Sequence, residues 1–251
     1  MYESLTLQPA TIKKMNEDLK SIFQNLIQNN IQNNSIEEVL DHLTDLFHED
    51  ICFSTSFSME DQVVTDFVKD SEVKIFTLDT GRLFEDTYNT WNLTRSKYKV
   101  NVKAYYPDHE ELEPFIQEKG PDSFYTSVDN RKKCCEIRKV HPLKRALKGN
   151  KVWITGLRAE HSPDRENLQQ LEWDESNQII KYHPILFWTT EQVKDHIKQK
   201  QIPYNILHDR GFVSIGCAPC TRAIQPGEDF RAGRWWWEDA NKKECGLHVH
   251  K

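Results

Sequence analysis

From residue 51 onward, short apolar runs alternate with stretches that have a helical pattern of hydrophobic positions. The apolar runs occupy residues 51–53, 73–76, 100–105 and 152–154. Helical patterns follow the first three runs and begin near Glu60, Phe84 and Glu111. This alternation is typical of parallel strands joined by helices, so we predict an α/β fold in which helices flank a parallel sheet.

The regions beside this core have patterns of their own. Residues 1–34 are rich in Asn and Gln and hold enough Leu, Ile and Phe for one peripheral helix. Ser35 and Glu38 form a capping-box pattern, which predicts that a further helix begins there. Two apolar segments, 171–173 and 179–182, flank a polar turn and predict a small hairpin after the sheet.

The C-terminal part loses this regularity. Thr189 and Gln192 predict one more capped helix, which runs through Ile197. Beyond Gly211 the sequence is rich in Gly, Pro, Cys, Trp and charged residues and has no sustained hydrophobic period, as expected of a mobile functional tail. We therefore divide the chain into an N-terminal helical extension, an α/β domain and a C-terminal tail: residues 1–50, 51–224 and 225–251.

Composition narrows the function classes. The chain has 33 Lys and Arg against 39 Asp and Glu, a formal net charge of -6, whereas a general nucleic-acid binder carries a clustered basic excess. No apolar run reaches the roughly 18 residues of a membrane span, and the N-terminus has no signal-peptide pattern. We expect a cytoplasmic protein that binds neither nucleic acid nor membrane. In that reducing compartment its six cysteines indicate metal or thiol chemistry rather than disulfides.

Polar loops follow three of the predicted strands. They are Ser54–Asp61, Leu78–Arg82 and Thr155–Arg158. Ligands of open parallel sheets bind beyond the carboxyl ends of the strands, and a helix N-terminus attracts anions, so the loops predict one anion-binding crevice. Each loop also has a structural alternative: Ser58 only caps a helix, Asp79-Thr80-Gly81 is only a tight turn, and Arg158 and Arg165 are solvated.

Four cysteines have spacings that suit a metal centre. They are the adjacent pair Cys134-Cys135 and the Cys-x-x-Cys of Cys217 and Cys220. Four thiolates can complete either a zinc site or an iron–sulfur cluster. Adjacent cysteines diverge, which suits the separate irons of a cluster better than a single zinc. A redox dithiol at Cys217 and Cys220 is a third interpretation, but it leaves the adjacent pair unexplained.

Positive charge surrounds the adjacent cysteines. The cations are Arg131, Lys132, Lys133, Arg138 and Lys139. We expect them to neutralise a negatively charged cluster and to reach an anionic substrate, although a solvated basic helix end is the alternative.

The last cysteine, Cys245, has no partner by spacing and no apolar run around it. Lys242, Lys243 and His248 lie close in sequence and favour its thiolate, so we predict a nucleophile. Cys52 lies in an apolar strand and is predicted to be inert packing. Upstream of the tail cysteine, Arg231 and Arg234 could grip an anion, while we assign only packing to Trp235-Trp236-Trp237.

Seven motifs resemble one known family. They are SFSMEDQV, LDTGRLF, KKCCEIRKVHPL, TGLR, IGCAPCTR, RAGRWWWE and KKECGLH, and together they run from about Ile51 to His248. In this order they are similar to the assimilatory adenylyl-sulfate (APS) reductases, the iron–sulfur relatives of phosphoadenylyl-sulfate (PAPS) reductases. The resemblance leaves the first fifty residues uncovered.

The resemblance implies a sheet like that of the adenine-nucleotide α-hydrolases and one 4Fe-4S cluster per chain, held by Cys134, Cys135, Cys217 and Cys220. It implies that the adenylyl part is held by loop residues Ser54, Ser56, Phe57, Ser58, Glu60, Asp61, Leu78, Asp79, Thr80, Gly81 and Arg82, with Gly156 beside them. It places around the phosphosulfate Lys139, Arg158, Arg165, Arg231, Arg234 and His248.

The implied reaction is the thioredoxin-dependent reduction of adenylyl sulfate to sulfite and AMP in sulfate assimilation and cysteine biosynthesis. We expect Cys245 to attack the sulfate sulfur and to carry an S-sulfocysteine intermediate. The cluster-free branch of the family acts on the 3'-phosphorylated nucleotide and lacks both cysteine pairs, so the unphosphorylated substrate is favoured.

Other functions stay open at this point. They are a PAPS or dual APS/PAPS reductase, an ATP-pyrophosphatase-type enzyme and a zinc-stabilised nucleotide-binding module. The Ser-Gly-Gly-x-Asp-Ser loop of the pyrophosphatase type is absent from the sequence. The oligomeric state is not fixed by the sequence, which allows a homo-oligomer.

Overall fold

The computed structural model describes residues 9–161 and 167–238, with the backbone alone for residues 9–15. Within these residues a six-stranded sheet has the order β3-β2-β1-β4-β6-β5. All neighbouring strands pair in parallel except β5, which is antiparallel to β6. The strands are β1 (Ile51–Ser54), β2 (Lys74–Leu78), β3 (Val102–Tyr105), β4 (Val152–Ile154), β5 (Leu171–Asp174) and β6 (Ile179–Tyr182).

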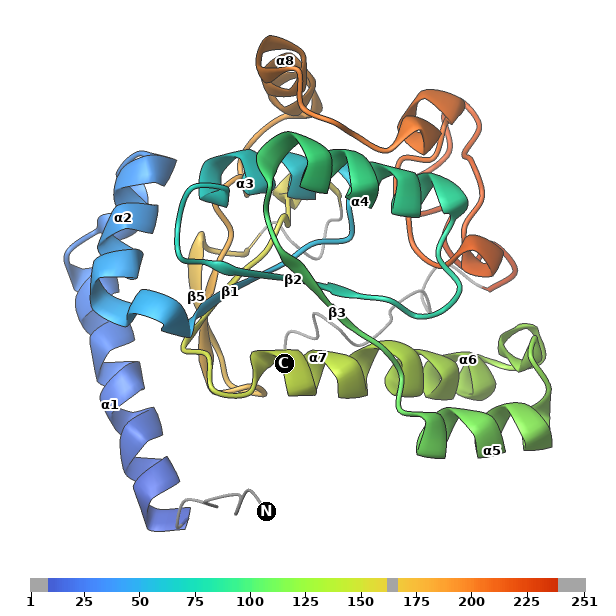
Figure 1. Ribbon diagram of the computed structural model, residues 1–251, viewed down its shortest axis with the longest axis horizontal. Coiled ribbons are helices and arrows are strands. Elements are labelled where there is room, and N and C mark those ends of the chain that lie inside the picture. Colours follow the sequence, from blue (N-terminus) through green and yellow to red (C-terminus); the bar gives the residue numbers. More distant parts are fainter. Residues whose placement is uncertain (1–8, 162–166, 239–251) are drawn as a thin grey trace.

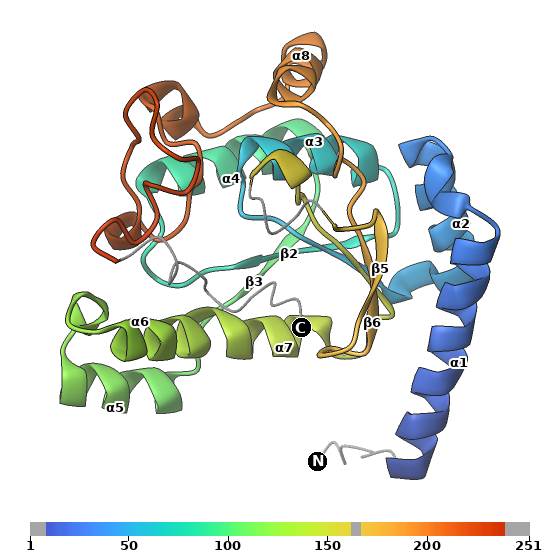
Figure 2. The ribbon, with the colours of Figure 1, turned by 180° about the vertical axis from the view of Figure 1, so that it is seen from behind.

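Helices cover both faces of the sheet, which confirms the predicted α/β class (Figures 1 and 2). One layer consists of α3 (Met59–Val68), α4 (Glu85–Tyr98) and α8 (Thr190–Lys200). The other consists of α5 (His109–Lys119), α6 (Val128–Cys135) and α7 (His141–Leu147). Each parallel strand therefore sends its following loop to the same edge of the sheet, where a ligand can bind.

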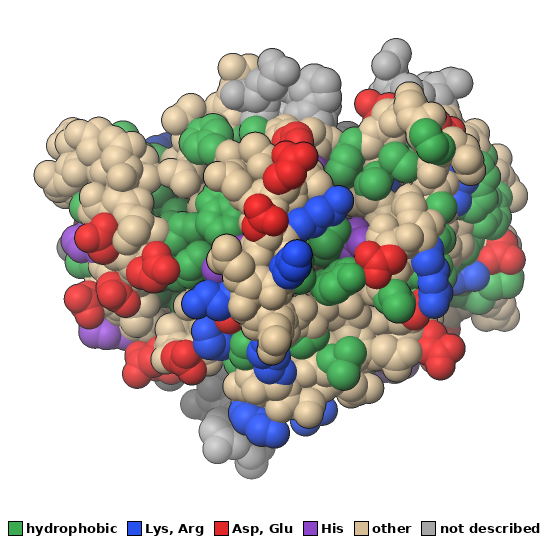
Figure 3. Space-filling view, turned by 90° about the horizontal axis from the view of Figure 1, so that it is seen from above, with side chains coloured by type: hydrophobic (Ala, Val, Ile, Leu, Met, Phe, Trp, Pro, Cys, Tyr) green, Lys and Arg blue, Asp and Glu red, His purple; other side chains and the backbone are tan. Residues whose placement is uncertain are grey.

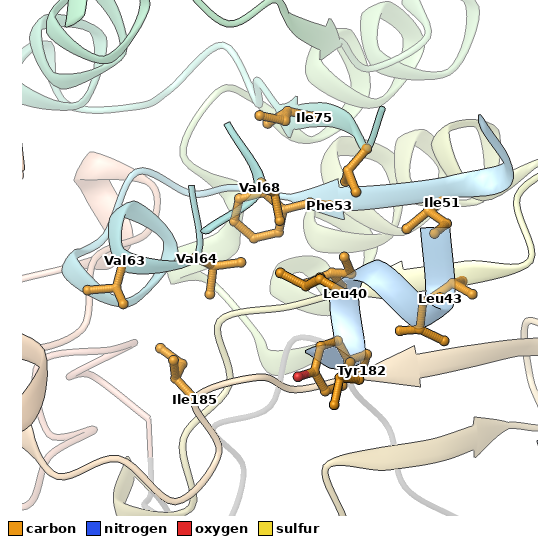
Figure 4. Packing of buried hydrophobic residues seen from close by; sticks show 14 of the residues in the cluster. Leu40, Leu43, Ile51, Phe53, Val63, Val64, Val68, Ile75, Tyr182 and Ile185 are labelled. Carbon is orange, nitrogen blue, oxygen red and sulfur yellow. The ribbon is translucent and has the colours of Figure 1, made fainter. Parts of the chain in front are cut away.

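The N-terminal helices share the core of the sheet. They are α1 (Pro9–Gln28) and α2 (Ile36–Phe47), and α2 begins with the predicted capping box of Ser35 and Glu38. Leu40 and Leu43 of α2 are buried in the same cluster as Ile51 and Tyr182 (Figure 4). Burial of these apolar side chains holds the extension against the sheet.

The predicted hairpin forms, but it belongs to the main sheet rather than following it. β6 lies between β4 and β5, and all four of its residues are buried. Lys181 is among them and pairs with Asp174 at 2.9 Å, both side chains being under a tenth exposed. A lysine in a strand looks solvent-facing in sequence, and its buried acidic partner explains why the segment is still an interior strand.

A π-helical turn, Glu136–Val140, joins α6 to α7 directly after the adjacent cysteines. At its start the Glu136 amide donates to the carbonyls of both Lys132 and Lys133. Such turns insert one extra residue into a helix and are frequent at functional sites, because they redirect the side chains that follow. The sequence did not reveal this helix.

The surface seen from above mixes acidic, basic and apolar side chains without one large field of a single sign (Figure 3). Among the described residues, no helix combines the length and the apolar character needed to cross a membrane.

Candidate functional site

Four cysteines from distant segments line one pocket. Cys134 and Cys135 come from the end of α6, and Cys217 and Cys220 from the loop beyond α8. Three of them are about 7% exposed, and Cys134 is half-buried. The space they surround is about 280 Å³, part of it open to solvent. The structure thus brings together all four predicted metal ligands.

The loop after β2 holds the Cys-x-x-Cys segment. Thr80 Oγ1 lies 3.3 Å from Cys217 Sγ, and the Ala218 amide donates to the Arg82 carbonyl at 2.8 Å. Arg138 donates to the Thr80 carbonyl at 2.6 Å and so ties the same loop to the helix of the adjacent cysteines. Residues assigned from sequence to the nucleotide therefore also position the thiols, and nothing in the spacing signalled the Thr80 contact.

Cations next to the thiols favour their ionised form. Burial raises the pKa of Cys217, but Lys139, the hydroxyl of Thr80, Arg234 and Arg138 together hold it below its usual value. The pKa of Cys220 is raised to about 12 by burial and by the neighbouring thiolates, which the cations only partly offset. Four thiolates can ionise together here only if a positively charged group shares the pocket.

Donor groups without acceptors surround this pocket. Arg138 Nε, Arg234 Nε and Trp235 Nε1 are buried and have no hydrogen-bond partner within the described residues. Buried donors are normally satisfied, so these three favour an electron-rich occupant that accepts hydrogen bonds. The donor set and the four thiols together suit an iron–sulfur cluster. As their side chains are placed, no group of three or more His, Cys, Asp or Glu among the described residues is arranged to hold a metal ion.

Fewer cations lie next to the thiols of Cys134 and Cys135 than the sequence predicted. Lys132 and Lys133 are exposed, and Lys133 pairs with Glu136 at 3.0 Å. Arg131 is fully buried, but Glu238 matches its charge at 2.7 Å. Lys132 and Lys133 therefore face solvent, while Arg131 lines the pocket with its charge matched by Glu238, so Arg138 and Lys139 are the cations of the five that act on the thiols.

The segment at 221–238 folds back over the cysteine loop. Thr221 and Arg234 form a β-bridge, and the Trp235 amide donates to the Cys220 carbonyl at 3.1 Å. A Cβ atom on Gly216 would lie 2.4 Å from the Arg234 guanidinium, so only glycine admits this arginine. Trp235 is 1% exposed and packs among the cysteines, which agrees with its predicted packing role. Arg231, four residues before it in sequence, lies over the same ring at 5.9 Å.

The loop after β1 wraps around a buried carboxylate. Ser56 donates to Asp61 through its amide and its hydroxyl, both at 2.6 Å. Ser58 stands at the N-cap position of α3, but its side chain makes no capping bond. A Cβ on Gly156 would lie 2.2 Å from Asp61 Oδ1, so the loop after β4 approaches as closely as glycine permits. These two strand-end loops therefore meet, as the sequence predicted.

Other members of the predicted nucleotide site have structural contacts. Ser54 Oγ accepts from the Trp153 indole at 2.8 Å, and Phe57 is buried against Trp91 with ring centroids 5.4 Å apart. Leu78 packs against the smaller core cluster below the sheet. The side chains of Phe57 and Leu78 thus have packing roles, and the assignment of these residues to the substrate stays a prediction.

The turn after β2 has the structure that its residues favour. Asp79 accepts from the Gly81 amide at 2.8 Å and from the Tyr88 hydroxyl at 2.9 Å. Gly81 has a φ of +72°, a conformation that suits glycine. Arg82 pairs with Asp122 at 2.8 Å. The tight turn and the contact with the cysteine loop thus occur together.

Arg158 is at the centre of a buried network. Its guanidinium contacts Glu60 at 3.1 Å, donates to the Trp188 carbonyl and Thr190 Oγ1 at 3.0 Å each, and also contacts Glu160 and His161. Burial raises the pKa of Glu60, but His161 and Arg158 outweigh it and lower that pKa to about 2. The network gives Arg158 a structural role, and its predicted contact with the phosphosulfate stays a prediction.

Three predicted residues, Arg165, Cys245 and His248, lie outside the described residues. Cys52 is described and is 1% exposed, and burial raises the pKa of its thiol to about 12. Its thiol is therefore protonated and enclosed, as expected of inert packing.

Comparisons with known proteins agree with the resemblance seen in the motifs. A model of the phosphoadenosine phosphosulfate reductase domain matches residues 50–223. The chain is 46% identical over 202 residues to the adenosine 5'-phosphosulfate reductase of Allochromatium vinosum, covering 80% of this chain and 79% of that protein. It is 45% identical over 204 residues to the protein of the same name from Neisseria meningitidis serogroup A, covering 80% and 84%.

Solved structures share the fold. The phosphate complex of phosphoadenylyl-sulfate reductase from Candida auris has a TM-score of 0.66 at 27% identity and covers 88% of this chain and 100% of that one. The FMN adenylyltransferase of Candida glabrata has a TM-score of 0.51 at 15% identity, covering 92% and 82%, and shares the fold alone.

The buried carboxyl of Asp61 gives a pH-dependent signal. Burial raises its pKa to about 6 from 3.8, while the donors of Ser56 oppose the rise. A folded-state pKa above the unfolded value means that ionisation opposes folding above about pH 6 and that this cost is relieved as the pH falls toward 4. In a carbon-detected NMR titration we expect a midpoint near pH 6 for Asp61, and a higher one in Ser56→Ala, which loses a donor to the charged form. A midpoint near 4 in the wild-type protein would contradict this electrostatic environment.

Proposed function

The chain belongs to the phosphoadenosine phosphosulfate reductase domain family, and on this premise we propose that it reduces adenylyl sulfate to sulfite and AMP in sulfate assimilation. It is then an oxidoreductase that acts on a sulfur group. The observation that carries the proposal is the pocket of four thiols among buried cations, inside a fold of this family. Relatives at 45–46% identity are named for the same substrate.

We assign one 4Fe-4S cluster to Cys134, Cys135, Cys217 and Cys220. The adjacent pair, the Cys-x-x-Cys and the unsatisfied donors of Arg138, Arg234 and Trp235 support this assignment over zinc. When bound, the cluster supplies a fixed negative charge that holds Lys139 and the neighbouring arginines in place. Electrons for the reaction come from elsewhere.

The nucleotide lies beyond the carboxyl ends of β1, β2 and β4. The Ser54–Ser58 loop, the first turn of α3 and the glycine of the β4 loop hold the adenylyl part, since ligands of open parallel sheets bind beyond the carboxyl ends of the strands and a helix N-terminus attracts an anion. Lys139 and Arg234 lie beside the cysteine pocket and orient the phosphosulfate, with Arg231 and His248 as further ligands. These cations also stabilise the charge that develops on the leaving AMP.

Cys245 is the nucleophile of the first step. Its thiolate attacks the sulfate sulfur, a sulfur–sulfur bond forms, and the sulfur–oxygen bond to AMP breaks with its electron pair leaving on AMP. A covalent S-sulfocysteine remains, so that one difficult displacement becomes two easier ones.

A thioredoxin supplies the two electrons of the second step. One of its thiolates attacks Cys245 Sγ and expels sulfite, and its second thiol then resolves the mixed disulfide. The products are sulfite, oxidised thioredoxin and free Cys245, so atoms and electrons balance. We place this chemistry in the cytoplasm, where dithiols stay reduced.

A PAPS reductase is the second candidate, since the family model and the Candida auris structure carry that name. The two cysteine pairs favour the unphosphorylated nucleotide, because the resemblance assigns them to the branch that uses it.

Removing one cluster ligand tests the cofactor assignment. We expect Cys135→Ala to lose the visible iron–sulfur absorption and bound iron, because a cubane needs four thiolates. Cys52→Ala is the matched control, since its thiol is buried in the core, and it should keep both. Iron retained in Cys135→Ala, or stoichiometric zinc in place of iron in the wild-type protein, would contradict the cluster.

Labelled substrate tests the nucleophile. After incubation with adenylyl sulfate radiolabelled in its sulfate group, without thioredoxin, we expect covalent label on the wild-type protein and none on Cys245→Ser. The hydroxyl is a far weaker nucleophile than the thiolate, so label should fall to background. Label that persists in Cys245→Ser would refute the assignment.

A further inference from the structure

We propose that the ion pair between Arg131 and Glu238 anchors residues 235–238 beside the cysteine pocket and is needed for efficient attack by Cys245. This role rests on the proposed function and adds two positioning residues to it.

The pair joins two segments far apart in the chain. Arg131 Nε and Nη2 donate to the two carboxylate oxygens of Glu238 at 3.0 and 2.7 Å, across 107 residues of sequence. The side chains are 0% and 4% exposed. A bidentate contact between planar groups fixes direction as well as distance.

Arg131 also belongs to the wall of the cysteine pocket. It lies on α6 three residues before Cys134, so the two side chains share one face of the helix. Its guanidinium lies 4.7 Å from the centre of the Trp235 ring, and Arg234 lies 4.8 Å from the same ring. Arg131 and the adjacent cysteine pair therefore belong to the same short helix, α6, which Figures 1 and 2 label.

The anchored residues form a turn tied at both ends. The Trp235 amide donates to the Cys220 carbonyl at 3.1 Å, and the Glu238 amide donates to the Trp235 carbonyl at 2.9 Å. Trp235 has a φ of +43°, which is unusual for a tryptophan and needs support from its surroundings. Buried ion pairs contribute little to stability on balance and often serve to select one arrangement of the chain.

Anchoring Glu238 limits the distance from Glu238 at which Cys245 can lie. Cys245 follows Glu238 by seven residues, and seven extended residues span at most about 25 Å. Without the pair, the nearest anchored residue is Trp235, which precedes Cys245 by ten residues. The longer spacing alone lowers the local concentration of the Cys245 thiol by only about two-fold. A larger loss of rate in a variant would therefore come from the lost orientation of residues 235–238.

A second pair in the same part of the chain provides a matched control. Arg222 and Glu228 also form a bidentate contact, with both distances 2.8 Å, but they lie six residues apart and are about one-third exposed. This pair holds a local turn, in which Glu228 also accepts from the Gln225 amide at 2.7 Å. Glu228→Gln therefore makes the same chemical change as Glu238→Gln without releasing the anchor.

The experiment compares Glu238→Gln and Arg131→Lys with Glu228→Gln. The first measurement is hydrogen exchange at residues 235–238 without substrate. The second is the single-turnover rate of label transfer from adenylyl sulfate to the protein without thioredoxin. We expect the two anchor variants to exchange faster and to acquire label roughly ten-fold more slowly, because misdirected reactants react slowly. Their affinity for AMP and their iron–sulfur absorption should stay within two-fold of wild type, and Glu228→Gln should match wild type throughout.

Two results would overturn the proposal. One is wild-type label transfer in both anchor variants. The other is slow transfer that falls in parallel with AMP affinity or iron–sulfur absorption, since the pair would then support the pocket rather than aim the segment. Sulfite release by a wild-type protein that never acquires label would refute the proposed nucleophile instead, and the exchange data would still decide whether the pair anchors the turn.

Discussion

Four thiols enclosed in one pocket impose the constraint on which the site depends. Thiolates repel one another in a buried space, and this repulsion contributes to the raised pKa of Cys220. Lys139, Arg138 and Arg234 offset part of that charge, and the positively charged iron–sulfur core of a bound cluster would offset a further part. In the proposed function the cations that balance the thiols also contact the anionic substrate, so cofactor and substrate would share the same charges.

The sheet connects this pocket to the proposed nucleotide site. The loop after β2 contacts both Cys217 and Arg138 through Thr80, while the loops after β1 and β4 meet at Asp61 and Gly156. All three loops leave the same edge because their strands are parallel. Rigid strand ends thus place a helix N-terminus and a thiol pocket side by side, which suits a molecule that has both a nucleotide and a sulfate group.

Much of this arrangement could be predicted from the sequence, because alternating apolar runs and capping boxes are local signals. The strands, the helices from α3 to α5 and the convergence of the four cysteines on one pocket belong to this part. Contacts between distant polar residues could not be predicted, since no local pattern pairs Lys181 with Asp174 or Arg131 with Glu238. For the same reason Arg158, which looked like an anion ligand, is found in a buried network with Glu60.

The central claim is that this pocket serves the reduction of adenylyl sulfate. The most direct measurement is the rate of sulfite release by the purified, iron-loaded protein with reduced thioredoxin, on nucleotides with and without a 3'-phosphate. The account predicts fast release from adenylyl sulfate and much slower release from its 3'-phosphorylated form. Equal rates, a preference for the 3'-phosphorylated nucleotide, or no sulfite from either would contradict it.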